Sequence, residues 1–193
     1  MPDHNNTRTP DAPLRPRLKK AAASLLHTRL ERRLPGADPI EGFVLRAGRT
    51  WTLVASISDM RFDGFTAVRT HDVETVLFQG PKTLTTRWLR TQGSWPPPTP
   101  TGRIRLGSTE NLLRSVAAHH PLLALFEEDL DPNICHIGTL TSTDPTESTL
   151  LEVTPNAHWH STPTTYPHPN LTRIDFADHY LHALQELAGP PHP

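Results

Sequence analysis

Leucine and alanine recur at every fourth position in residues 17–34, a stretch that contains neither glycine nor proline. Apolar residues at this spacing form a slanted stripe along one side of a helix. The following Pro35-Gly36 would end that helix. The pattern therefore predicts a basic N-terminal helix over residues 14–36, preceded by a polar, disordered tail over residues 1–13. The stripe consists of Leu18, Ala22, Leu26, Leu30 and Leu34.

The spacing of apolar residues changes from four to two after residue 37. This alternation, on both sides of a glycine-containing turn, predicts a β-hairpin with one buried face. Short β segments follow at residues 65–69 and 73–78. We therefore expect a first β unit over residues 37–95 and a Pro-rich surface loop over residues 96–107. The alternating positions are Phe43, Leu45, Trp51, Leu53, Ala55 and Ile57.

Helical and β patterns return in the second half of the chain. Ser108 or Thr109 can cap a helix, several short apolar segments follow, and Asp178 can cap a last helix that Gly189-Pro190 ends. We expect a helix, a second β unit and a C-terminal helix within residues 108–189, followed by a tail over residues 190–193.

The two β units also resemble each other in sequence. Short, bent strands in such an order are typical of a small β-barrel, which closes its own edges. We therefore predict an α+β protein with two small β-barrels, or one fused antiparallel β system, and peripheral helices. The corresponding segments are residues 42–45 with 138–141, 51–57 with 148–154, and 71–78 with 169–176.

Residues 56–76, SISDMRFDGFTAVRTHDVETV, resemble the Sm-like variety of the SH3-type barrel. In that family a strand ends in Asp, a turn carries Asn, and an Arg-Gly pair precedes two spaced apolar residues. Asp59 and Arg69 stand at family-like positions, Asp63 replaces the Asn, and Thr70-His71 replaces the glycine. The resemblance covers residues 39–78 and, more faintly, 135–176. It implies tandem Sm/SH3-like barrels with a ligand-binding role for Asp59, Asp63 and Arg69.

The same substitutions disfavour RNA as the ligand. A carboxylate at Asp63 accepts hydrogen bonds but cannot donate them, and it repels phosphate. The whole chain has a formal net charge of −1, so no general positive field attracts nucleic acid. We therefore expect no sequence-specific RNA binding, and any weak binding should come from the basic N-terminal helix.

Histidines in the second half suggest an alternative. His158 and His160 flank Trp159 on a predicted strand, His168 lies in the next loop, and His179 begins the last helix. Converging imidazoles would suit zinc and a metal-dependent reaction. However, no Cys pair or His-Glu-x-x-His motif supports this, and surface or core-edge histidines explain the pattern more simply.

The remaining features bound the class of protein. The single cysteine, Cys135, allows no intrachain disulfide, and we expect it to be buried and unreactive on a strand. No apolar run is long enough to span a bilayer, and the polar N-terminus lacks a signal-peptide core, so we expect a cytoplasmic protein. Many Arg, Thr, Pro, Ala and His residues and few Lys indicate a GC-rich bacterial genome.

Three hypotheses for function follow. The first is a non-enzymatic binding or regulatory module that uses no cofactor and engages a protein or peptide partner or copies of itself. The second is a metal-dependent enzyme or metal-binding protein that uses zinc at His158, His160, His168 and His179. The third is an RNA-binding Sm-like protein.

Overall fold

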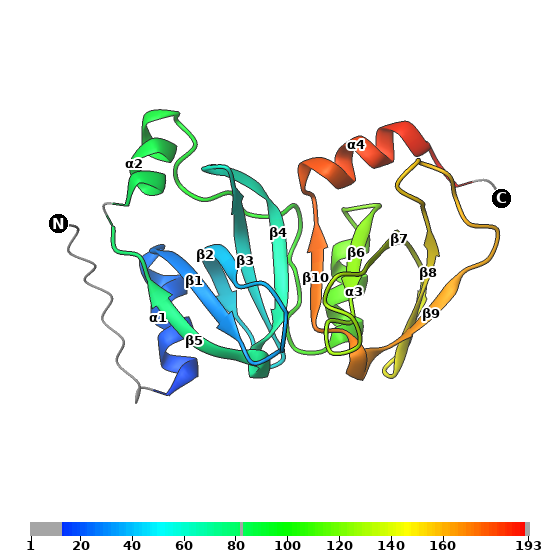
Figure 1. Ribbon diagram of the computed structural model, residues 1–193, viewed down its shortest axis with the longest axis horizontal. Helices are drawn as coiled ribbons and strands as arrows, with labels where there is room; N and C mark the ends of the chain where they lie inside the picture. The colour runs from blue at the N-terminus through cyan, green and yellow to red at the C-terminus, as the bar shows by residue number, and fades with distance from the viewer. Residues whose placement is uncertain (1–12, 82, 192–193) are drawn as a thin grey trace.

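A computed structural model of the protein describes residues 13–81 and 83–191; the predicted tail over residues 1–13 lies almost entirely outside this range. Within it, ten strands form one antiparallel sheet and four helices surround the sheet (Figure 1). The strand order is β5-β1-β2-β3-β4-β10-β6-β7-β8-β9. The α+β class and the fused antiparallel β system are confirmed. In the described residues the sheet is open, and β5 and β9 are its edge strands.

The first half of the chain supplies five strands and two helices. Its elements are α1 (Leu14–Ser24), β1 (His27–Arg32), β2 (Ile40–Ala47), β3 (Trp51–Ser58), β4 (Arg61–Arg69), the 3-10 turn η1 (Thr70–Asp72), β5 (Val73–Phe78) and α2 (Leu84–Thr91).

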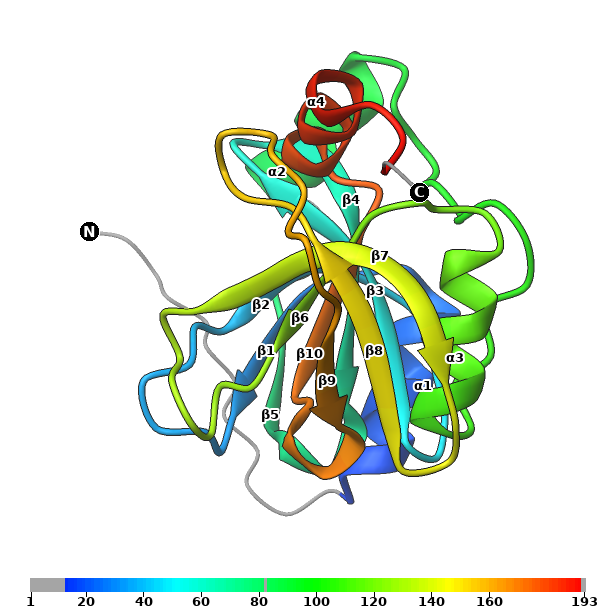
Figure 2. The ribbon, with the colours of Figure 1, turned by 90° about the vertical axis from the view of Figure 1, so that its right-hand side faces the viewer.

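The second half repeats this order of elements. They are α3 (Thr109–Ala117), β6 (Leu123–Phe126), β7 (Cys135–Thr143), β8 (Glu147–Glu152), β9 (Thr164–Pro167), the 3-10 turn η2 (His168–Asn170), β10 (Arg173–Phe176) and α4 (His179–Ala188). In each half the strand that follows the 3-10 turn pairs with the first strand, which gives the orders β5-β1-β2-β3-β4 and β10-β6-β7-β8-β9. Figures 1 and 2 show α1 and α3 on the same side of the sheet, with α2 and α4 at one end.

The strand register makes the repeat specific. β2 and β7 each contain one bulge, which follows Val44 and Leu140 respectively. Gly42 and Gly138 stand at the same position before these bulges. A Cβ added at Gly42 would lie 2.2 Å from the Ala55 carbonyl oxygen, and one at Gly138 would lie 2.3 Å from that of Leu151. Both glycines are therefore required where neighbouring strands approach closely.

This register corrects one sequence correspondence. Val44 pairs with Val54, and its equivalent Leu140 pairs with Leu150, so Val54 corresponds to Leu150. The sequence comparison of 51–57 with 148–154 matches Val54 to Leu151 and is wrong by one residue. Both segments are apolar at several successive positions, so their hydrophobic pattern does not fix the register.

The predicted N-terminal helix over residues 14–36 is wrong in its second half. α1 ends at Ser24, because Leu25 adopts a left-handed conformation with a φ of 47°, and β1 follows. Along β1 the side chains of Thr28, Leu30 and Arg32 are buried on alternate positions. A spacing of four residues fits both a helix and every second inward position of a strand. Leucines at this spacing therefore did not distinguish the two.

The sheet buries side chains on both faces. Trp51, Leu53 and Leu125 belong to a core that joins the two halves. Val54 and Val73 belong to a second core under α1. The expectation of a hairpin with a single buried face is therefore wrong. The apolar surface below α4 forms a third, smaller core.

Residues 84–91 form α2, although the sequence pattern was assigned to a β unit over residues 37–95. No helix in the described residues is long and apolar enough to cross a membrane.

Candidate binding surfaces at the joint of the two halves

The two halves meet where β4 pairs with β10. The antiparallel register runs from Phe65 opposite Phe176 to Val68 opposite Arg173. Beyond it, the Arg69 amide donates to the Thr172 carbonyl at 3.1 Å. The sheet is therefore continuous across the joint.

A buried ion pair also crosses the joint. Arg32 at the end of β1 contacts Glu128, which follows β6, and their side chains are 0% and 2% exposed. Nη2 of Arg32 donates to Oε1 of Glu128 at 2.7 Å and to the Asp38 carbonyl at 2.7 Å. The Thr172 hydroxyl donates to the other carboxylate oxygen of Glu128 at 2.7 Å. Because the pair has several hydrogen-bond partners, the cost of burying its charges is offset.

The three residues implied by the Sm-like resemblance do not come together. Asp59 lies in the turn between β3 and β4, and Asp63 near the start of β4 accepts a hydrogen bond from the His179 amide at 2.9 Å. Arg69 lies at the other end of β4, about 20 Å away for a strand of this length. Asp59, Asp63 and Arg69 therefore cannot share one small ligand, and a binding role for each stays a prediction.

Arg69 instead connects the turns of the two halves. Its Nε donates to Asp72 at 2.6 Å, and its two terminal nitrogens donate to the Pro169 carbonyl at 2.6 Å and to Asp129 at 2.8 Å. Only 11% of the side chain is exposed. With every nitrogen of its guanidinium engaged, Arg69 serves as a structural contact across the joint.

A polar groove crosses the same joint at the α4 end of the sheet. It consists of two adjacent hollows of about 340 and 550 Å³ that share Ser56, Ile57, Thr66 and Arg173. We call it the joint groove. Its remaining lining residues come from both halves and are Arg29, Asp38, Pro39, Ile40, Glu41, Ser58, Asp63, Phe65, Asp175, Asp178 and Tyr180.

The joint groove is acidic, with five carboxylates and two guanidinium groups. Arg173 forms a two-pronged ion pair with Asp175 and lies 4.4 Å from the centre of the Phe126 ring. Burial, the largest single cause, would lower the pKa of Arg173, but the charge and hydrogen bond of Asp175 together with the charges of Glu128 and Asp38 outweigh it and raise the pKa. Burial raises the pKa of Asp178, and the charges of Asp175 and Asp63 act in the same direction. The local field therefore favours an added cation.

Sequence reasoning missed most of this groove. Arg173 and Asp175 are two residues apart on a short strand, so they face the same side of the sheet. That spacing was a signal for a charged strand face. The sequence did not predict that Asp38 and Glu41 line this groove, because the groove forms only when the first half pairs with the second.

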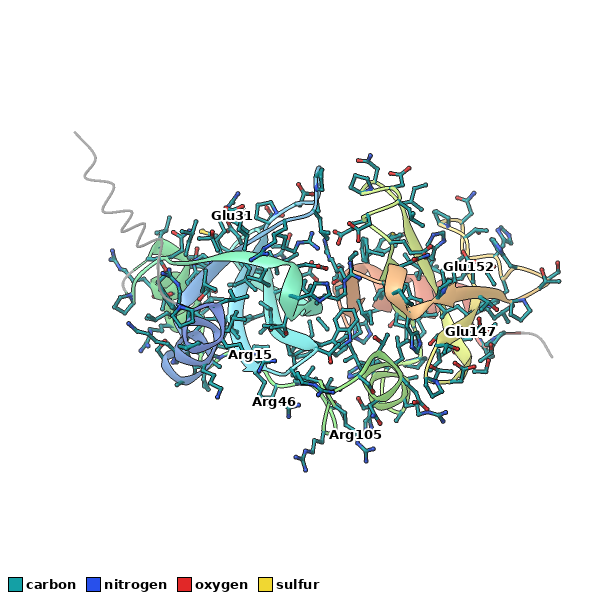
Figure 3. The ribbon with its side chains drawn as sticks, turned by 90° about the horizontal axis from the view of Figure 1, so that it is seen from below. Arg15, Glu31, Arg46, Arg105, Glu147 and Glu152 are labelled. Atoms are coloured by element: carbon teal, nitrogen blue, oxygen red, sulfur yellow. The ribbon has the colours of Figure 1, made fainter. Side chains whose placement is uncertain are left out.

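Several arginines lie on the side of the sheet that carries α1 and α3. Figure 3 shows Arg15, Arg46 and Arg105 on the side that carries α1 and α3, and Glu31 on the opposite side.

A buried Ser–His pair links β8 to the turn between β9 and β10. The Ser148 Oγ is 2.6 Å from Nε2 of His168, and Nδ1 of His168 is 3.3 Å from the Pro145 carbonyl. A serine and histidine at this distance could form part of a nucleophilic site. However, Ser148 is 1% exposed and His168 is 8% exposed, so a substrate cannot reach them. The pair is structural.

In the part of the chain that the structure describes, the four histidines predicted to bind zinc do not come together. His168 is held by Ser148, and His179 is the first residue of α4. His158 and His160 lie in an irregular segment in which only Trp159 forms an isolated bridge, so the predicted strand is wrong there. Across residues 13–81 and 83–191, no group of three His, Cys, Asp or Glu residues could hold a metal ion.

Cys135 is exposed at the start of β7, which corrects the expectation that it is buried. Partial desolvation raises its pKa, and the charge of Asp175 adds to this effect. The thiol is therefore less ionised than an ordinary cysteine, and less nucleophilic.

The chain matches no protein-family profile, no curated protein and no solved structure.

Proposed function

We propose that the chain is a tandem of two Sm/SH3-like units that acts as a non-enzymatic binding module, in which the joint groove binds a basic segment of a protein partner. The repeated order of helix, five strands and 3-10 turn supports the tandem interpretation. The observation that carries the binding function is the joint groove itself, which crosses both halves and has five carboxylates against two guanidinium groups.

The groove favours a peptide-like ligand over a small metabolite. It is elongated and open, and polar side chains line most of it. Small-molecule sites are usually more enclosed and more apolar. Exposed Tyr180 at one end offers an aromatic surface to a lysine or arginine side chain. An anionic backbone such as RNA would be repelled by the same carboxylates.

The test uses a lysine–serine repeat decapeptide as the probe and calorimetric titration of the full chain at two salt concentrations. Asp38→Asn/Glu41→Gln removes two groove charges, and Glu147→Gln/Glu186→Gln removes two exposed charges outside the groove. We expect the first pair to weaken binding about three- to tenfold, because each partly exposed charge contributes up to about 1 kcal/mol. The second pair should have little effect.

Two outcomes would contradict the proposal. Equal weakening in both variants would mean that the peptide responds only to net charge. Tighter binding of a glutamate–serine decapeptide or of a single-stranded oligonucleotide than of the lysine peptide would mean that the acidic groove is not the site.

A further inference from the structure

The two edge strands of the sheet correspond to the two strands that meet at the joint. In the repeat, β5 is the equivalent of β10, and β9 is the equivalent of β4. In the described part of the chain neither edge strand has a neighbour on its outer side. Figure 1 shows β5 and β9 in opposite halves of the molecule. The joint therefore shows which contacts each edge strand would need in order to bind another strand.

At the joint, β4 provides a row of backbone donors. The Arg69 amide donates to Thr172 of the opposite strand segment. Alternate residues of an antiparallel strand face the same neighbour. The amides of Phe65 and Ala67 therefore face β10 together with that of Arg69.

β9 lacks two of the three backbone donors that its equivalent β4 provides. Trp51 pairs with Arg69 in the first half, and its equivalent Glu147 pairs with Pro167 in the second, so Pro167 corresponds to Arg69. Pro163 stands four residues before Pro167, as Phe65 stands four residues before Arg69, so Pro163 corresponds to Phe65 on the same edge of the strand. Proline has no N–H group, and prolines on an edge strand prevent another strand from pairing there. The outer edge of β9 is therefore blocked.

β5 keeps the features of its equivalent, β10. It contains no proline, and its Val76 and Phe78 correspond to Ile174 and Phe176, which face β4 at the joint. The Val76 carbonyl accepts a hydrogen bond from the Arg17 guanidinium, so a donor already approaches this edge from α1. Phe78 is partly exposed, and the cationic groups of Arg17 and Lys20 lie over its ring at 5.7 and 5.5 Å.

We propose that β5 is a docking edge for an extended segment of another protein, which adds to the sheet as an antiparallel strand. Because the prolines of β9 remove its donors, a second copy of this chain cannot supply that strand by repeating the joint. The internal joint indicates the chemistry of the segment: alternating apolar residues with free amides on one edge, as in β4. Strand addition of this kind takes its affinity from backbone hydrogen bonds and its specificity from alternate side chains.

The probe is a synthetic peptide with the sequence of β4, Arg61–Arg69, titrated into the isotopically labelled full chain. We expect amide chemical-shift changes to centre on Val76 and Phe78 of β5. N-methylation of the peptide at the positions of Phe65 and Ala67 should weaken binding at least about tenfold, which is about 1.4 kcal/mol. N-methylation at Thr66 and Val68 places the methyl groups on the outer edge and should leave binding intact.

Three comparisons complete the test. A peptide with the sequence of residues 163–167, which carries both prolines, should not bind. The wild-type chain should sediment as a monomer, whereas Pro163→Phe/Pro167→Arg, which restores the donors of β9, should self-associate. Arg17→Ala should tighten peptide binding, because the arriving strand no longer displaces the guanidinium from Val76.

The groove variant Asp38→Asn/Glu41→Gln should bind the strand peptide normally, so a failure of the groove proposal and a failure of this one are distinguishable. The proposal is overturned if the shifts centre on another element, if both N-methylation patterns have the same effect, or if the wild-type chain self-associates through β9.

Discussion

His168 and Thr70 occupy the same position in the two halves and form equivalent hydrogen bonds with different side chains. The Thr70 amide donates to Thr50 and the His168 amide donates to Thr146, both at 2.8 Å. Thr70 then pairs its hydroxyl with Thr52, whereas His168 pairs its ring with Ser148. At this position only the second half has a titratable side chain, so acid should weaken the contact of His168.

Two buried histidines and one half-buried histidine predict a loss of stability on acidification. Burial lowers the pKa values of His27, His120 and His168 below the ordinary value of 6.5. The folded chain therefore binds fewer protons than the unfolded chain, and stability is complete above about pH 6.5 and declines as the pH falls through that value. Urea unfolding at about pH 7.5 and about pH 5.5 measures the change.

His168→Thr provides the matched variant for this prediction, because it copies Thr70. It should lose less stability between the two pH values than the wild-type chain. The raised pKa of Asp178 acts in the opposite direction in both proteins, so the comparison between them isolates His168. An identical pH dependence in His168→Thr and in the wild type would exclude His168 as a contributor.

At the scale of elements, the sequence predicted the strand-rich character, α3, α4 and the positions of most strands along the chain. Caps at Ser108 and Asp178 are present as expected, since each accepts a hydrogen bond from a backbone amide of the first helical turn. β1 was mistaken for helix because leucines at a spacing of four fit both structures. α2 was missed because it is short and presents few apolar residues to the core.

Neighbouring strands lie unusually close together at the glycines before the two bulges, which predicts that larger residues there destabilise the sheet. Gly42→Ala and Gly138→Ala each place a Cβ against a carbonyl oxygen of the adjacent strand, at 2.2 and 2.3 Å. The backbone must shift in either variant, so each should lower the free energy of unfolding by about 1–3 kcal/mol. Gly107→Ala, where an added Cβ meets nothing within 4 Å, is the control. Equal stability of all three variants would show that the strands have room at the bulges.

At the scale of the molecule, the candidate site depends on pairing between strands far apart in sequence. The joint groove exists because β4 pairs with β10, and neither strand's pattern specifies that neighbour. Hydrophobic alternation indicates which side of a strand is buried but not which strand lies beside it. The sequence therefore predicted two units. It did not predict the pairing of β4 with β10 that joins them, or the groove that crosses this joint.

The ion pair across the joint should contribute to the cohesion of the two halves. Arg32→Met leaves the Glu128 carboxylate buried without its cation, so the free energy of unfolding should fall by about 3–5 kcal/mol in urea titration. Arg32→Met/Glu128→Leu removes both charges and should recover most of that loss. Arg29→Met breaks ion pairs whose side chains are about one-third exposed, and should cost at most about 1 kcal/mol. If the double variant is no more stable than Arg32→Met alone, the unpaired charge is not the cause, and the pair does not hold the joint in the way that its geometry indicates.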